Sequence, residues 1–206
     1  NHPIAKSIVG HFNINADKSS EIVFTSGATQ SLNMIFYGNP GTGKTTVARL
    51  FAKMFKDMGM LRNGQLVECS RVDLIAEYVG QTAVKTTNVF NSVLGGVLFI
   101  DEAYSLSTGA DNDFGKEAID TLIKLMEDHR GEIVVILAGY TKEMNEFLKV
   151  NSGLESRFPI RLEFQDYNVK ELTEIFSKML DSRGFKIEES AMNLAIEKYK
   201  KIEDIK

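Results

Sequence analysis

A glycine-rich stretch that ends in Lys-Thr carries the strongest chemical signal in the chain. Its eight residues, Gly38-Asn39-Pro40-Gly41-Thr42-Gly43-Lys44-Thr45, match G-x-x-x-x-G-K-[ST] in full. In this pattern the glycines let main-chain N–H groups point at phosphate oxygens, and the lysine reaches the β- and γ-phosphates of a nucleotide. The next hydroxyl, that of Thr45, binds Mg²⁺. The expected nucleotide-binding residues are Asn39, Pro40, Gly41, Thr42, Gly43, Lys44, Thr45 and Thr46.

An acidic pair, Asp101-Glu102, follows the apolar run Val97–Ile100. If that run is a buried strand, both carboxylates lie at its carboxyl end. We expect Asp101 to support the Mg²⁺ shell and Glu102 to orient and polarise an attacking water. Two solvated carboxylates at a strand end are the alternative, and the phosphate-binding pattern upstream makes it the less favoured one.

Five short apolar runs predict the strands that must hold these residues. They are Asn33–Tyr37, Leu66–Cys69, Val97–Ile100, Ile133–Ala138 and Ile160–Phe164. Between them, apolar residues at helical spacing predict helices over residues 47–58 and 114–126. Strands that alternate with helices favour a parallel sheet covered on both faces, with ligands at the carboxyl ends of the strands. The predicted fold class is α/β, a three-layer domain around a five-stranded parallel sheet.

The pattern becomes helical after residue 166. Asn168-x-x-Glu171 is a capping-box pattern that starts a helix over Val169–Ser182, and a second helix is expected over Ala191–Tyr199. We therefore expect an atypical N-terminal segment over residues 1–31, a core over 32–166 and a partial helical subdomain over 167–206.

Composition excludes several classes of protein. The 206 residues hold 24 Lys and Arg against 28 Asp and Glu, a net charge of −4, which gives no basic surface for nucleic acid or an anionic membrane. The longest apolar stretches, residues 95–100 and 133–139, are too short to span a bilayer. Cys69 is the only cysteine, so no disulfide forms within the chain, and the cytoplasm is the expected compartment.

Six stretches together resemble the AAA+ ATPases. They are NMIFYGNPGTGKTTVARL, LIAEYVGQT, GGVLFIDEAYSL, DFGKEAIDTLIKLMEDHR, VVILAGY and GLESRFP. From about residue 32 on, the chain closely resembles the bacterial branch that holds stage V sporulation protein K and red-type rubisco activase. The resemblance implies a P-loop NTPase fold with a truncated C-terminal helical lid, ATP or ADP and Mg²⁺ as ligands, and Mg²⁺-dependent ATP hydrolysis that remodels a protein substrate.

The same resemblance implies further roles by position. Tyr78, Val79 and Gly80 fall at the loop that lines a central pore and grips a threaded polypeptide. Arg157 matches the arginine finger that completes a neighbouring subunit's site, which implies a ring, a hexamer in this family. Tyr140, with Thr141 next, lies nearest to the position of the polar sensor residue. The residues alone leave alternatives open: Tyr78 ends a short helix capped by Ser70 and packs, and Arg157 is a surface residue with local ion pairs.

The N-terminal segment departs from this family. Residues 1–31 resemble a short piece of a cysteine desulfurase, a class V aminotransferase-like protein, in which the turn Ser26–Thr29 cradles the phosphate of pyridoxal phosphate. Here we expect a relic turn without a ligand, a strand over Glu21–Thr25, and a chimera of natural or engineered origin. The tail also ends before the further lid helices and their second arginine sensor. Two other functions follow as alternatives: a nucleotide-binding module with little or no turnover, and an engineered chimera without a physiological role.

Overall fold

The computed structural model describes residues 14–16, 32–107 and 114–203. The strand expected over Glu21–Thr25 and the turn Ser26–Thr29 lie outside these residues. The chain divides into two compact units, Asn1–Gln165 and Asp166–Lys206, and each is described here by itself.

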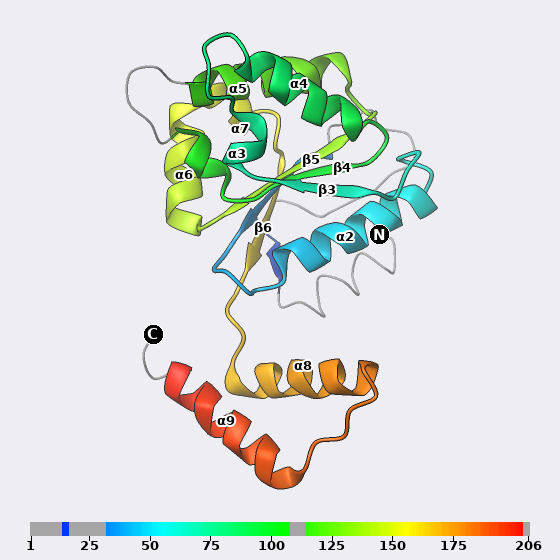
Figure 1. Ribbon diagram of the computed structural model, residues 1–206, viewed down its shortest axis with the longest axis vertical. Coiled ribbons are helices and arrows are strands. Elements are labelled where there is room, and N and C mark those ends of the chain that lie inside the picture. Colours follow the sequence, from blue (N-terminus) through cyan, green and yellow to red (C-terminus); the bar gives the residue numbers. More distant parts are fainter. Residues whose placement is uncertain (1–13, 17–31, 108–113, 204–206) are drawn as a thin grey trace. The chain divides into compact units, whose positions relative to one another are not determined.

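One sheet forms the centre of the first unit (Figure 1). Its strands are β1 (Ile14–Ala16), β2 (Met34–Tyr37), β3 (Leu66–Cys69), β4 (Val97–Ile100), β5 (Val134–Gly139) and β6 (Ile160–Phe164). Their order in the sheet is β1-β6-β2-β5-β4-β3. The five strands β2 to β6 run parallel, which confirms the predicted five-stranded parallel sheet, and β1 adds an antiparallel edge strand to β6.

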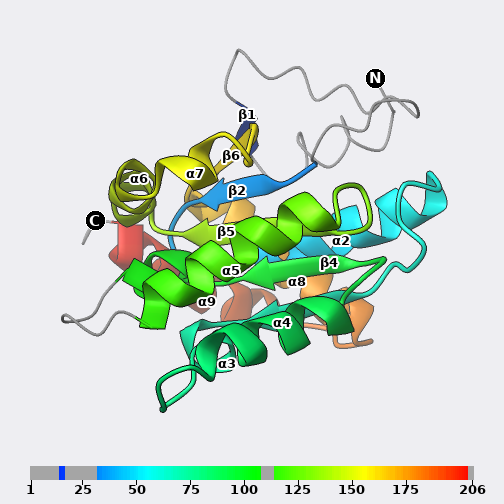
Figure 2. The same cartoon turned by 90° about the horizontal axis from the view of Figure 1, so that it is seen from above.

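Helices cover both faces of this sheet. They are α2 (Lys44–Asp57), α3 (Arg71–Leu74), α4 (Thr82–Ser92), the 3-10 helix η1 (Ala103–Ser107), α5 (Phe114–Asp128), α6 (Thr141–Val150) and α7 (Ser152–Glu155). Figure 1 shows α2 on one side of the sheet, whereas α4 and α5 lie on the other, and Figure 2 looks onto that second side. The layers are therefore helix, sheet and helix, as the alternating pattern predicts.

Alternate residues of the buried strands point to opposite faces of the sheet and contribute to two separate hydrophobic cores. Phe36 of β2 and Phe99 of β4 pack with Phe51 of α2 on one face. Leu98 and Leu137 on the opposite face pack with the apolar stripes of α4, α5 and α6. Strands β2, β4 and β5 are buried along their whole length, which explains why their sequences are continuous apolar runs.

Two close contacts fix the ends of β2. The buried side chain of Asn33, just before this strand, accepts a hydrogen bond from the Val135 N–H at 2.8 Å and donates one to the Arg157 carbonyl at 3.2 Å. At the other end Gly38 has φ +144°, and a Cβ there would lie 2.5 Å from the Phe164 carbonyl oxygen. Only glycine lets β6 approach the strand end this closely.

The second unit consists of α8 (Val169–Ser182) and α9 (Glu189–Glu203). The predicted capping box is present: the Asn168 side chain accepts a hydrogen bond from the Glu171 N–H at 3.0 Å, and the Glu171 carboxylate accepts one from the Asn168 N–H at 2.9 Å. Both expected helices are confirmed, and α8 has the predicted bounds. Among the described residues, no helix has the length and apolar character needed to cross a membrane.

Candidate functional site

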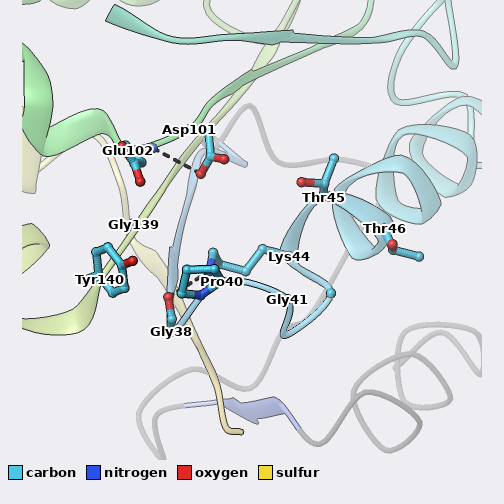
Figure 3. A pocket seen from close by; sticks show the side chains of 11 residues that line it. Gly38, Pro40, Gly41, Lys44, Thr45, Thr46, Asp101, Glu102, Gly139 and Tyr140 are labelled. Atoms are coloured by element: carbon cyan, nitrogen blue, oxygen red, sulfur yellow. Dashed lines mark hydrogen bonds between the residues drawn. The ribbon is translucent and has the colours of Figure 1, made fainter. Parts of the chain in front are cut away.

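A pocket of about 360 Å³ opens at the carboxyl ends of β2, β5 and β4, which are neighbours in the sheet. Its walls are Gly38, Pro40, Gly41, Gly43, Lys44, Thr45, Thr46, Asp101, Glu102, Gly139 and Tyr140 (Figure 3). The pocket thus brings together the glycine-rich loop, the acidic pair and the residue after β5. The first and last of its residues, Gly38 and Tyr140, are more than 100 positions apart in the sequence. Asn39, Thr42, Thr141, Arg157 and the stretch Tyr78–Gly80 do not line it.

The glycine-rich loop leads straight into α2. Gly43 is the N-cap of this helix in a left-handed conformation, with φ +89°, and no side chain caps the helix. The first turn of α2 lines the pocket, so the positive end of the helix dipole lies at the pocket wall. Thr42 is buried beneath the loop, where its hydroxyl donates to the Asn39 carbonyl at 2.8 Å and holds the turn.

Lys44 brings the positive charge of the pocket. Its ammonium donates hydrogen bonds to the carbonyls of Gly38 and Asn39, each at 2.7 Å. The side chain is thereby folded back across the mouth of the loop rather than extended into solvent. A cation and a row of N–H groups on one wall make this surface suited to a polyphosphate.

Asp101 and Thr45 provide the oxygen ligands that Mg²⁺ prefers. In Figure 3 the Thr45 hydroxyl points toward the side of the pocket where the Asp101 carboxylate lies. The described residues contain no cluster of three or more His, Cys, Asp or Glu side chains. One carboxylate and one hydroxyl still fit Mg²⁺, because this ion usually completes its shell with phosphate oxygens and water.

Glu102 occupies a strained turn between β4 and η1. It is the one non-glycine residue with positive φ, +47°, in the described part of the chain. Its N–H donates to the Asp101 carboxylate at 3.0 Å, and its carbonyl accepts from the Ser105 N–H at 2.8 Å. Such a backbone costs on the order of 1–3 kcal/mol and persists where the surrounding structure fixes it. The turn keeps the Glu102 side chain exposed at the pocket wall.

The two sensor candidates differ in position. Tyr140 follows β5, is the N-cap residue of α6 and lines the pocket. Thr141 is the first residue of α6 and lies outside the lining. The structure thus brings Tyr140, and not Thr141, to the pocket wall.

Tyr104 is a residue at this site that sequence reasoning did not single out. A Cβ on Gly139 would lie 2.8 Å from Cδ1 of Tyr104, so this ring packs directly on the end of β5. The ring also lies beside that of Tyr140, with centroids 6.2 Å apart. The signal in the sequence is its position two residues after Glu102, but the contact with β5 depends on packing between distant segments.

Arg157 is half-buried in the first unit and does not line the pocket. Its guanidinium donates to the Gly153 carbonyl at 3.0 Å and lies 3.7 Å from the Glu127 carboxylate. Hydrogen bonding and charge from Arg130, and then the charge of Arg157, lower the pKa of Glu127. Arg157 therefore makes local interactions within its own chain.

The segment between α3 and α4 projects into solvent. The predicted short helix begins after its Ser70 cap but ends at Leu74, four residues before Tyr78. Tyr78 is 67% exposed and Val79 is 83% exposed, so the alternative in which Tyr78 ends the helix and packs is wrong. The base of this loop is held by Lys85, whose ammonium donates to the carbonyls of Val72 and Ile75 at 2.6 and 2.9 Å.

Comparison with known proteins gives a consistent result. The sequence profile of the ATPase family associated with various cellular activities (AAA) matches residues 34–166. The chain is 56% identical to stage V sporulation protein K of Bacillus subtilis over 162 residues, which are 79% of this chain and 50% of that protein.

Proteins from mycobacteria match over the same share of the chain. Identity is 46% over 167 residues to the ESX-3 secretion system protein EccA3 of Mycobacterium tuberculosis, which is 81% of this chain and 26% of that protein. It is 44% over 173 residues to the ESX-1 secretion system protein EccA1 of Mycolicibacterium smegmatis, 82% of this chain and 30% of that protein. The chain thus spans half the length of the sporulation protein and less than a third of these secretion proteins.

Proposed function

The chain belongs to the AAA family of ATPases, and on this basis we propose that it binds ATP with Mg²⁺ in the pocket and hydrolyses it to ADP and phosphate. One observation carries the proposal. The glycine-rich loop, the acidic pair and Tyr140 end three neighbouring strands and surround a single pocket. Phosphoryl transfer needs little covalent chemistry from a protein, so positioning and charge at one place account for most of the catalysis.

Each group at the pocket has a part in this reaction. Main-chain N–H groups of the loop and the Lys44 ammonium hold the β- and γ-phosphates. Thr45 and Asp101 would hold Mg²⁺, which would neutralise charge that develops on the phosphate oxygens. Glu102 orients the water that attacks the γ-phosphorus as the bond to the β–γ bridging oxygen breaks, and Tyr140 contacts the γ-phosphate side of the pocket.

Turnover and binding test this function separately. We expect the purified chain to release phosphate from ATP only with Mg²⁺ present, and to bind ADP in a calorimetric titration. ADP binding without phosphate release would favour the alternative of a nucleotide-binding module. Absence of both would contradict the proposed site.

Arg157 is proposed to act on the pocket of a neighbouring subunit in a ring. Two observations support this: the residue lies outside its own pocket, and its guanidinium is held near the surface by Gly153 and Glu127. A cation brought to the γ-phosphate from a neighbour would stabilise the charge of the transition state.

Arg157→Ala should lower turnover by about 10³-fold or more, as removal of an arginine finger does, while ADP affinity stays unchanged. A mixing experiment identifies the action in trans. Arg157→Ala chains have an intact pocket, and Lys44→Ala chains have an intact arginine, so mixed rings should recover turnover that neither variant shows alone. Arg161→Ala, which removes the pair with Glu155 at 2.8 Å, is the matched control and should keep turnover. A mixture no more active than its separate components would contradict the role.

The exposed loop Tyr78-Val79-Gly80 is proposed to grip a protein substrate in the centre of the ring. Its aromatic and apolar side chains are held in solvent, where they can contact a chain of any sequence. The helix before this loop is linked to the pocket: Arg71 at the start of α3 donates to the Ser105 carbonyl at 2.5 Å, and the Ser105 N–H donates to the Glu102 carbonyl.

Tyr78→Ala should weaken substrate binding without loss of basal turnover, because the side chain is 67% exposed and does not line the pocket. A suitable probe is fluorescent, carboxymethylated α-lactalbumin, which is permanently unfolded, and its anisotropy in the presence of ATP measures binding. We expect at least a fivefold loss of affinity, on the scale of one buried aromatic contact of about 1 kcal/mol. Tyr78→Phe should retain binding, and so should Met179→Ala, which removes an exposed apolar side chain from α8. Equal binding by all three variants would exclude the loop as the grip.

The relatives' names refer to two different processes, sporulation and ESX secretion. The part that this chain shares with them is the ATPase core. We therefore propose for this chain only what such a core would supply to both processes, ATP-driven work on a protein.

A further inference from the structure

Asn33, directly before β2, is a buried polar residue that has no part in the pocket. Its side chain belongs to a residue that is only 5% exposed and that does not line the pocket. The Oδ1 atom accepts a hydrogen bond from the Val135 N–H, and the Nδ2 atom donates one to the Arg157 carbonyl. These partners fix the orientation of the amide, because its oxygen has to face the N–H and its NH₂ group has to face the carbonyl.

The two hydrogen bonds connect three segments of the chain. Strand β2 lies between β5 and β6 in the sheet (Figure 2), and Arg157 lies in the turn that joins α7 to β6. The first residue of β2, Met34, is in register with Ile136 of β5 and with Ile160 of β6. The Asn33 side chain therefore adds one polar link to each neighbour just before the regular pairing of the strands begins.

The main chain of Arg157 is held from both sides. Its N–H donates to the Leu154 carbonyl at 2.9 Å, and its own carbonyl accepts from Asn33 at 3.2 Å. The side chains of Leu154 and Phe158 are buried in the hydrophobic core. Of these contacts, the hydrogen bond from Asn33 is the one that joins the arginine to the strand that leads into the phosphate-binding loop.

A side chain that reaches into another subunit needs a fixed starting point. An error of about 1 Å in the position of a catalytic group can lower the rate on the order of 10²-fold. On the basis of the proposed action of Arg157 on a neighbouring subunit, we propose that Asn33 is a positioning residue, whose buried amide holds the Arg157 main chain against β2 and β5 and so sets the place from which the guanidinium reaches the neighbouring γ-phosphate. Asn33 thus acts through Arg157, on the site of the next subunit rather than on its own pocket.

Asn33→Ala tests this role, because it removes both hydrogen bonds and leaves Arg157 in the sequence. We expect turnover to fall by roughly 10- to 100-fold, with the KM for ATP and the affinity for ADP unchanged. The matched control is Thr86→Val, which keeps the shape of another buried side chain and removes its hydrogen bond to the Leu74 carbonyl at 3.0 Å. This control should retain the turnover of the wild type.

Mixed rings distinguish positioning of the arginine from damage to the fold. Lys44→Ala chains have a well-placed arginine, so a mixture with Asn33→Ala chains should recover turnover well above the mean of the two components. Arg157→Ala chains supply no arginine, so their mixture with Asn33→Ala chains should show no recovery. A purely structural defect in the pocket of the Asn33→Ala chain would be repaired by neither partner, and that result would overturn the proposal.

A double-mutant cycle shows whether Asn33 acts through Arg157. In an Arg157→Ala background, Asn33→Ala should cause little further loss, since the group that it positions is already gone. An equal loss in both backgrounds, or an Asn33→Ala variant within twofold of the wild-type rate, would overturn the proposal. Should Asn33→Ala fail to bind ADP, Asn33→Ser takes its place in every mixture, because its single short hydroxyl cannot replace both hydrogen bonds. Loss of ADP binding in both variants would show a structural role alone and would likewise overturn it.

The same experiments distinguish this proposal from those on which it rests. If the wild-type chain with Mg²⁺ releases no phosphate, ATP hydrolysis itself fails. If Arg157→Ala and Lys44→Ala chains do not complement each other, the action of Arg157 in trans fails, and the role of Asn33 fails with it. If those two variants complement each other and Asn33→Ala turns over normally, only the role of Asn33 fails.

Discussion

Lys44→Ala should abolish measurable ATP turnover and weaken ADP binding. Removing the ammonium takes away a charge-assisted hydrogen bond to phosphate, worth about 1.5–3 kcal/mol, so ADP affinity should fall roughly 10- to 100-fold. The loss of turnover should be larger, because charge on the γ-phosphate oxygens grows in the transition state. Calorimetry with ADP and a phosphate-release assay measure the two effects.

A matched control distinguishes the loss of a positive charge at the pocket from the loss of one elsewhere on the same helix. Lys53 is an exposed lysine of the same helix, α2, and Lys53→Ala should keep both ADP affinity and turnover. The fold should survive in both variants, because Lys44 is only partly buried and the exposed Asn39 carbonyl can bond to water instead. An unaltered ADP affinity in Lys44→Ala would place the nucleotide somewhere other than this pocket.

Glu102→Gln should separate binding from chemistry. The amide keeps the size of the side chain but accepts a proton poorly, so turnover should fall by about 10²- to 10⁴-fold, the usual contribution of a positioned acid or base. ATP affinity should hold or rise, because a negative charge near the triphosphate has been removed. Single-turnover phosphate release and equilibrium binding of ATP give the two numbers.

Glu132→Gln changes a partly exposed carboxylate in the turn after α5 and is the control for loss of charge. Its turnover should equal that of the wild type. A Glu102→Gln variant that hydrolyses ATP at more than a tenth of the wild-type rate would remove Glu102 from its assigned role. A parallel loss of ATP binding would instead indicate a collapsed pocket.

The strands and long helices could be predicted because their signals are local. Continuous apolar runs reveal strands that are buried on both faces, and β2, β4 and β5 are such strands. Apolar residues at helical spacing gave α2 and α5, and Asn168 with Glu171 gave the start of α8. The pocket then follows from topology, since ligands of open α/β sheets bind at the carboxyl ends of the strands.

Features that depend on contacts between distant segments were not predictable. The edge strand β1 has only three residues, too few to show a period. The positive φ of Glu102 and the packing of Tyr104 on Gly139 arise where η1 meets β5, almost forty positions along the chain. The residue types alone favour a Tyr78 ring that packs at the end of a short helix. In the structure, α3 ends at Leu74 and the Tyr78 ring is exposed to solvent.

The position of the short strand β2 has a consequence for the order in which the subunits of a ring would hydrolyse ATP. The phosphate-binding loop follows its last residue. Just before its first residue, the side-chain amide of Asn33 donates a hydrogen bond to the Arg157 carbonyl. If Arg157 acts on a neighbouring subunit as proposed, this fully buried strand lies between the phosphate loop of its own subunit and the arginine offered to the next. Release of phosphate from one site would then displace Arg157 in the site of the adjacent subunit. On that proposal, the subunits of a ring would hydrolyse ATP one after another around the ring rather than at random.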